Sequence, residues 1–265
     1  MQAIHFPERT PRRTQQALSQ LERAGLVAHV DVRRSPRRVW FLTELGADWV
    51  MDAGADREPK VLGPEQAAGP LRAHTLGVNE VGISFLRAAR KRGDEFSSIS
   101  WRHEVAHPLN RGRGRARRAL ITDAVFTYAS TVGQDFLIEQ RFVEVDRATL
   151  SVERLAAELA RYGELEHARE KTGGQRIWKR YYRRFPPVIC ALTGAKREAL
   201  FRRLDVVLNL LFDHPALTRS YSDVAIYFCL LDDLMARGPF APVFYKLDAL
   251  NHPVDWLGKP KDGQQ

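Results

Sequence analysis

The hydrophobic pattern of this chain is most regular over residues 119–147, where two strand-like runs flank a short turn. Residues 119–129 are rich in Ile, Val, Phe, Thr and Tyr, which suit a pleated, half-buried strand. Residues 135–145 alternate, so that every second side chain shares a face. Gly133, between the two runs, is free to take the positive φ that tight turns often need. The pattern predicts a β-hairpin.

Three acidic residues interrupt the apolar pattern of this hairpin. Pairing of the two strands places Asp123, Glu144 and Asp146 on the same side of the sheet. An ionised carboxylate inside a strand is costly unless it is paired or bound to a cation. One interpretation is a divalent-metal site, and the other is an ordinary ion-pair network. The arginines that could neutralise the acids in such a network are Arg118, Arg141 and Arg147.

The first 50 residues combine a polar helix with two short strands. Residues 10–11 (Thr-Pro) supply a cap and a helix-starting proline, and apolar residues then recur at helical spacing as far as Gly25. The strand-like pieces LVAHVDV and RVWFLT follow, joined by the basic RRSPRR. This order predicts the second half of a winged helix, whose helix can lie in a DNA groove while the wing touches phosphate.

Basic and polar side chains gather on both elements that would touch DNA. They are Arg12, Arg13, Gln15, Gln16 and Ser19 on the helix, and Arg33, Arg34, Arg37 and Arg38 on the wing. This concentration favours double-stranded DNA over the alternative of a winged helix used for protein contacts. Only MQAIHFPE precedes the module, so we expect it to be N-terminally incomplete.

Composition and pattern together predict two domains of mixed α/β structure. We expect the winged helix over residues 1–54, a linker over 55–72, a second domain over 73–256 and a disordered tail over 257–265. Within the second domain the pattern reads helix, three strands, helix, strand, helix, strand. Such an order predicts a mixed sheet with helices on both faces.

Two further basic segments carry alternative interpretations. The run LNRGRGRARR (109–118) is either a solvated loop or a phosphate-steering element in which Arg113, Arg115 and Arg117 act beside Asp123. The run RIWKRYYRRF (176–185) interleaves bases with aromatic residues, as contacts to single strands often do. Its spacing favours instead a helix whose Trp178 and Tyr181 pack inward.

Charge and cysteine usage narrow the cellular setting. The 265 residues carry a formal net charge of +9, which favours an anionic partner such as nucleic acid. Cys190 and Cys229 each lie in an apolar run, as buried thiols of a reducing cytosol do. No window has the length of a membrane helix and no signal peptide follows Met1, so we expect a cytoplasmic protein without membrane association. The histidines do not cluster beyond His103 and His107, which we expect in a loop; this disfavours a covalent tyrosine relaxase.

Several segments together resemble the replication-relaxation family of bacterial plasmids and conjugative elements. They are RVWFLTELG, HTLGVNEV, SWRHE, ITDAVF, FVEVDRAT and RLAAELARY, in that order. The resemblance implies a winged helix followed by a PD-(D/E)xK domain, that is, a restriction-endonuclease-like mixed sheet flanked by helices. It also implies a DNA-handling role in replication, mobilisation or relaxation.

The resemblance assigns roles to individual residues. Asp123 matches the motif aspartate, Glu144 matches its acidic metal ligand, and Glu80 stands where relatives place a further carboxylate. Asp146 and Arg147 match the family's Glu-x-Asp-Arg and complete the expected catalytic set. The implied cofactor is Mg²⁺ or Mn²⁺. Asp146 also marks a departure, because the nuclease motif has at that position a lysine that stabilises developing charge or orients water.

These observations support three hypotheses of different classes. The first is a DNA-binding protein of a mobile element that nicks DNA with a divalent metal. The second is a winged-helix transcriptional or copy-control regulator whose nuclease-like domain is an inactive scaffold, which the absent lysine favours. The third is an interaction module that meets other replication or transfer proteins through its basic surface.

Overall fold

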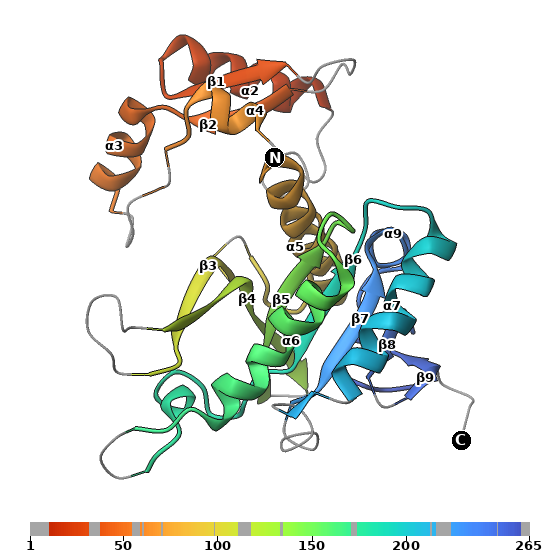
Figure 1. Ribbon diagram of the computed structural model, residues 1–265. Coiled ribbons are helices and arrows are strands. Elements are labelled where there is room, and N and C mark those ends of the chain that lie inside the picture. The colour runs from red at the N-terminus through yellow and green to blue at the C-terminus, as the bar shows by residue number, and fades with distance from the viewer. Residues whose placement is uncertain are drawn as a thin grey trace. The chain divides into compact units, whose positions relative to one another are not determined.

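The computed structural model divides into two compact units, Met1–Leu76 and Gly77–Gln265, which are described separately. Its fold is mixed α/β, as predicted, with a small antiparallel sheet in the first unit and a mixed sheet in the second (Figure 1). The structure describes residues 11–31, 38–54, 59, 61–69, 71–97, 99–110, 118–132, 135–170, 174–212, 214–215, 224–247 and 249–260.

In the first unit, α2 (Pro11–Arg23) buries Thr14 and Leu18 and leaves its basic face exposed. The helix stops at Gly25, as its sequence predicts. Gly25 has a φ of +72° and donates to the Glu22 carbonyl, while Leu26 donates to the Leu21 carbonyl. These two bonds form the Schellman pattern, in which glycine takes the left-handed position.

A hairpin and a tightly packed helix follow. Strands β1 (Val27–Asp31) and β2 (Arg38–Leu42) pair antiparallel. The Thr43 hydroxyl accepts from the Gly46 N–H at 3.0 Å and caps α3 (Glu44–Asp52). A Cβ at Gly46 would lie 1.9 Å from the Leu26 carbonyl oxygen, so only glycine fits this approach. Helix α4 (Pro64–Ala68), in residues expected as a linker, also packs on the hairpin.

The second unit is built on a sheet of order β3-β4-β5-β6-β7-β8-β9. The strands are β3 (Trp101–Pro108), β4 (Ala119–Val132), β5 (Asp135–Asp146), β6 (Val188–Leu192), β7 (Ile226–Leu230), β8 (Phe244–Lys246) and β9 (Ala249–Val254). The first three are antiparallel, β5, β6 and β7 are parallel, and the last pairings are antiparallel again. The predicted mixed sheet is therefore observed, whereas β8 and β9 had no clear signal in the sequence.

Helices cover both faces of this sheet. From Gly77 onward, α5 (Leu71–Arg92) lies on one face, where the Phe85 ring contacts Phe126 and Tyr128. Helices α6 (Val152–His167) and α7 (Arg197–Phe212) lie together on the other face (Figure 1). The 3₁₀ turn η2 (Ile177–Arg180) precedes β6, and α9 (Leu231–Arg237) follows β7. No helix in the described part of the chain is both long and apolar enough to cross a membrane.

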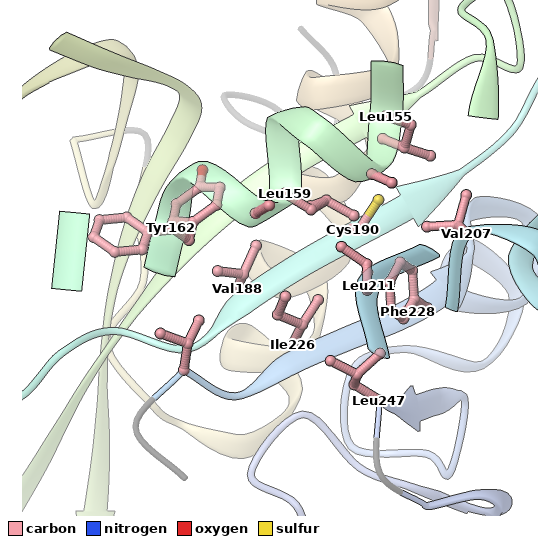
Figure 2. Close-up of a cluster of buried hydrophobic side chains, with 14 of the residues drawn as sticks. Leu155, Leu159, Tyr162, Val188, Cys190, Val207, Leu211, Ile226, Phe228 and Leu247 are labelled. Atoms are coloured by element: carbon pink, nitrogen blue, oxygen red, sulfur yellow. The ribbon is translucent and has the colours of Figure 1, made fainter. Parts of the chain in front are cut away.

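The main core lies between the sheet and the α6–α7 pair. Figure 2 shows side chains of α6 and α7 converging on β6 and β7. They are Leu155, Leu159 and Tyr162 of α6, Val207 and Leu211 of α7, Val188 and Cys190 of β6, and Ile226 and Phe228 of β7. Cys190 and Cys229 are both buried, as their apolar runs predict, and both thiols are free.

Candidate functional site

Asp123 and Glu144 meet at the point where the β4–β5 ladder ends. The ladder's last pair is Ala124 with Val143, and one further step along each strand reaches Asp123 and Glu144. The Asp123 Oδ2 accepts from the Val145 N–H at 2.8 Å, and the two carboxyl groups lie within hydrogen-bonding reach of each other. The prediction that these two acids share one side of the sheet is confirmed.

The environment of Glu144 favours its protonated form. Burial, followed by the charge of Asp123, raises the pKa of Glu144 well above its usual 4.5, and Glu158 adds to this effect. The hydroxyl of Tyr162, on α6, donates to Glu144 Oε1 and acts in the opposite direction. Two adjacent carboxyl groups cannot both ionise cheaply, so the pair holds a proton unless a cation replaces it.

Asp146 lies on the same face but has a different partner. The Nε and Nη2 atoms of Arg203, on α7, donate to its two carboxylate oxygens at 2.5 and 3.1 Å. Ala148 N–H donates to Oδ1 at 3.1 Å, and the Asp146 side chain is 1% exposed. This closed ion pair leaves the expected catalytic role of Asp146 without a geometric basis.

Two of the three arginines expected to neutralise the acids form ion pairs elsewhere. Arg118 pairs with Glu164, and Arg141 pairs with Glu139. Arg147 contributes its carbonyl to a tight contact with Gly194, where a Cβ would lie 2.3 Å from the oxygen. The ion-pair interpretation therefore holds for Asp146, through an arginine that the sequence pattern did not indicate.

The larger metal-ligand set expected from the sequence does not assemble. Glu80 lies on α5, whose Gly77 approaches Val145 on the face of the sheet opposite Glu144. Among the described residues, no three His, Cys, Asp or Glu side chains are grouped so as to hold a metal ion. Any cation at this site would therefore have Asp123 and Glu144 as its carboxylate ligands.

Two groups near the carboxyl pair were missed by the sequence reasoning. Tyr162 fitted the apolar face of its helix, and only its hydroxyl hinted at a polar neighbour. His103 was expected in a loop but lies on β3, as does His107. Burial lowers the pKa of His103, while the charges of Glu104 and Asp123 raise it in part.

The exposed face of α2 forms a second candidate site. It borders a hollow lined by Arg12, Arg13, Gln15, Gln16, Ala17, Ser19, Gln20 and Arg23. None of these residues is acidic, and all the helix residues predicted to face DNA are among them. On the wing, Arg38 pairs with Asp31 at 3.3 Å. The predicted contacts Arg33, Arg34, Arg37, Arg113, Arg115 and Arg117 lie outside the described residues.

A family model described as replication-relaxation matches residues 1–177 of the chain. This chain belongs to the replication-relaxation family. Membership supports a broad role in plasmid replication and relaxation. Comparisons with curated proteins and with solved structures gave no match.

The matched region of this replication-relaxation protein contains the α2 face and the carboxyl pair. It ends at residue 177, before α7 and Arg203. The partner of Asp146 therefore comes from a part of the chain that the family model does not reach, which is why the resemblance could not indicate it.

Proposed function

We propose that this replication-relaxation protein binds duplex DNA through the exposed face of α2. The observation that carries the proposal is the composition of that face: the described residues that line its hollow offer guanidinium, amide and hydroxyl donors, and none of them is acidic. Such donors are the ones that contact phosphate and sugar in protein–DNA complexes. Thr14 and Leu18 anchor the opposite side of the helix, so the donors stand on a rigid element.

Duplex binding is tested by charge reversal on this face. In fluorescence anisotropy with a labelled duplex, Arg12→Glu/Arg13→Glu should weaken binding at least tenfold. It should also reduce the slope of log K against log[salt] by about 1.8, or ~0.9 per phosphate contact. The matched control is Arg202→Glu/Arg237→Glu, which changes the same charge at exposed positions of α7 and α9. Equal loss in the two variants would show that only net charge matters and would reject the α2 surface.

We further propose that Asp123 and Glu144 hold a divalent cation during DNA nicking. Two carboxylates with room for water and phosphate oxygens are a common way to bind Mg²⁺ or Mn²⁺. The fit rests on the pair itself, because burial and the adjacent charge of Asp123 disfavour the ionisation of both acids together. When bound, such a cation supplies an activated water and stabilises charge on the scissile phosphate.

The residues around the pair would prepare it for this role. The Val145 N–H fixes one oxygen of Asp123, and the Tyr162 hydroxyl orients Glu144. Glu144 must release its proton to bind a cation, so Mn²⁺ affinity should increase with pH. The Asp146–Arg203 pair favours the alternative of an inactive regulator, because arginine stays protonated and cannot shuttle a proton as a lysine can.

An assay for nicking of supercoiled plasmid with Mn²⁺ distinguishes the nicking enzyme from the inactive regulator. An enzyme predicts activity that Asp123→Ala and Glu144→Ala both abolish, with Mn²⁺ binding lost in calorimetry. Glu144→Gln is the matched control for folding, because its amide oxygen still accepts from Tyr162 while its charge is gone. If nicking survives in all three variants, it comes from a contaminant. If the unaltered chain neither binds Mn²⁺ nor nicks DNA, the regulator is favoured.

A further inference from the structure

The basic segment between α6 and β6 is firmly anchored on one side. Trp178 and Tyr182 are 7% and 4% exposed. The Trp178 Nε1 donates to the Glu166 carbonyl at 3.1 Å, and the Tyr182 ring lies 5.3 Å from that of Phe142. Backbone bonds from Tyr181 and Tyr182 to the Trp178 carbonyl hold the turn that separates them. The inner side of the segment is thus part of the core.

The outer side of the same segment is exposed, aromatic and basic. We call it the basic aromatic strip: Lys179, Arg180, Tyr181, Arg183 and Arg184, all exposed. Tyr181 is 55% exposed, so the prediction that it packs inward is wrong. Tyr182 takes the inner position because the 3₁₀ turn ends at Arg180 and the chain changes direction.

The charges of the strip are only partly neutralised. Arg180 pairs with Glu170. Within the described residues, no acidic side chain forms an ion pair with Lys179, Arg183 or Arg184. Three exposed cations around one exposed ring can pair with phosphate groups while the ring stacks on a flat ligand face.

We propose that the basic aromatic strip binds single-stranded nucleic acid. A single strand presents unstacked bases to the Tyr181 ring and phosphates to Lys179, Arg183 and Arg184, which is the combination such surfaces use. A duplex hides its base faces and would leave the ring without a stacking partner. An acidic protein segment would use the charges but not the exposed ring.

The strip is joined by ring contacts to the carboxyl pair. Tyr182 contacts Phe142, the Phe142 ring lies 5.3 Å from that of Tyr162, and Tyr162 donates to Glu144. The segment that carries the strip therefore packs on the same face of the sheet as Asp123 and Glu144. The binding proposal does not require catalysis at that pair, nor does it require duplex binding by α2.

Anisotropy of a labelled oligothymidylate of about 20 nucleotides tests the strip in the full chain. Tyr181→Ala should weaken binding about tenfold, and Tyr181→Phe, which keeps the ring, should retain it. Arg183→Glu/Arg184→Glu should weaken oligothymidylate binding further and reduce the slope of log K against log[salt] by about 1.4, or ~0.7 per phosphate contact. The control Arg202→Glu/Arg237→Glu, and Arg12→Glu/Arg13→Glu on α2, should have little effect on this oligonucleotide.

Four results would overturn the proposal. Unchanged oligothymidylate binding in Tyr181→Ala would exclude stacking on the ring. Equal losses in the strip variant and the charge-matched control would leave only a net-charge effect. If duplex binding falls as much as single-strand binding, the strip binds duplex DNA. If polyglutamate competes as well as the oligonucleotide at equal charge, the strip binds an acidic protein segment. Thermal unfolding of each variant confirms that exposed substitutions leave the fold intact.

Discussion

Glu144 and Asp146 stand two residues apart on the same face of β5, yet they are stabilised in opposite ways. Arg203 holds Asp146 through two hydrogen bonds and seals it from solvent. Glu144 instead meets the carboxyl group of Asp123 and the hydroxyl of Tyr162. An acid in a strand therefore does not identify a site by itself; the charge of its partner decides whether it is structural or free to exchange a proton for a cation.

The largest expected effect comes from breaking the ion pair. Asp146→Ala leaves the Arg203 side chain, only 11% exposed, without its counter-charge. We expect the free energy of unfolding to fall by about 3 to 5 kcal/mol, measured by urea denaturation. The double variant Asp146→Leu/Arg203→Met should recover most of this loss, because no unpaired charge remains. A loss below about 1 kcal/mol in the single variant would contradict a structural role for the pair.

The loop beside this ion pair gives the next largest effect. Gly194 has a φ of +86°, and a Cβ there would lie 2.3 Å from the Arg147 carbonyl oxygen. Gly194→Ala should cost about 3 kcal/mol from backbone strain and steric overlap together, measured by thermal unfolding. Gly93 is the matched control, with a φ of +74° and open space around it, so Gly93→Ala should cost about 1 kcal/mol. Equal costs would mean that the contact with Arg147 gives way.

The hairpin, its side-chain parity and the convergence of Asp123 with Glu144 could be predicted because they depend on local alternation. The partner of Asp146 could not, because Arg203 lies 57 positions away on another helix. Helical spacing also gave no reason to separate Arg203 from its basic neighbours on α7. Long-range pairing of charges is fixed by packing of elements, which a single sequence does not reveal.

Aromatic residues show the same limit at shorter range. Tyr162 follows the helical spacing of the apolar residues of α6, but the group that its hydroxyl contacts depends on how α6 packs on β5. In the basic aromatic strip, the order of Tyr181 and Tyr182 was misjudged because the segment leaves helical geometry after one 3₁₀ turn. Periodicity predicts burial only for as long as the same helix continues.

The next effect is smaller and concerns how the free energy of unfolding depends on pH through Glu144. The folded state raises the pKa of Glu144, mainly by burial and by Asp123, so the stability from its bound proton is complete below about pH 4.5 and is lost as pH rises. Glu144→Gln does not ionise and keeps the Tyr162 hydrogen bond. The variant should match the unaltered chain near about pH 4 and exceed it by about 2 kcal/mol near about pH 8 in urea denaturation. A difference that does not change with pH would contradict this assignment.

The smallest effect concerns the hydroxyl group that holds Glu144. Tyr162→Phe removes a donor that favours the ionised acid, so the pKa of Glu144 rises further. Stability should fall by about 1 kcal/mol, and Mn²⁺ affinity near neutral pH should fall several-fold and recover at higher pH. Tyr182→Phe is the matched control, because that buried tyrosine lies on the same face but has Arg102, not a carboxyl group, as its charged neighbour. If both variants weaken Mn²⁺ binding equally, the tyrosine acts through packing alone, and the contrast between a proton-holding pair and a closed ion pair would rest on Asp123 only.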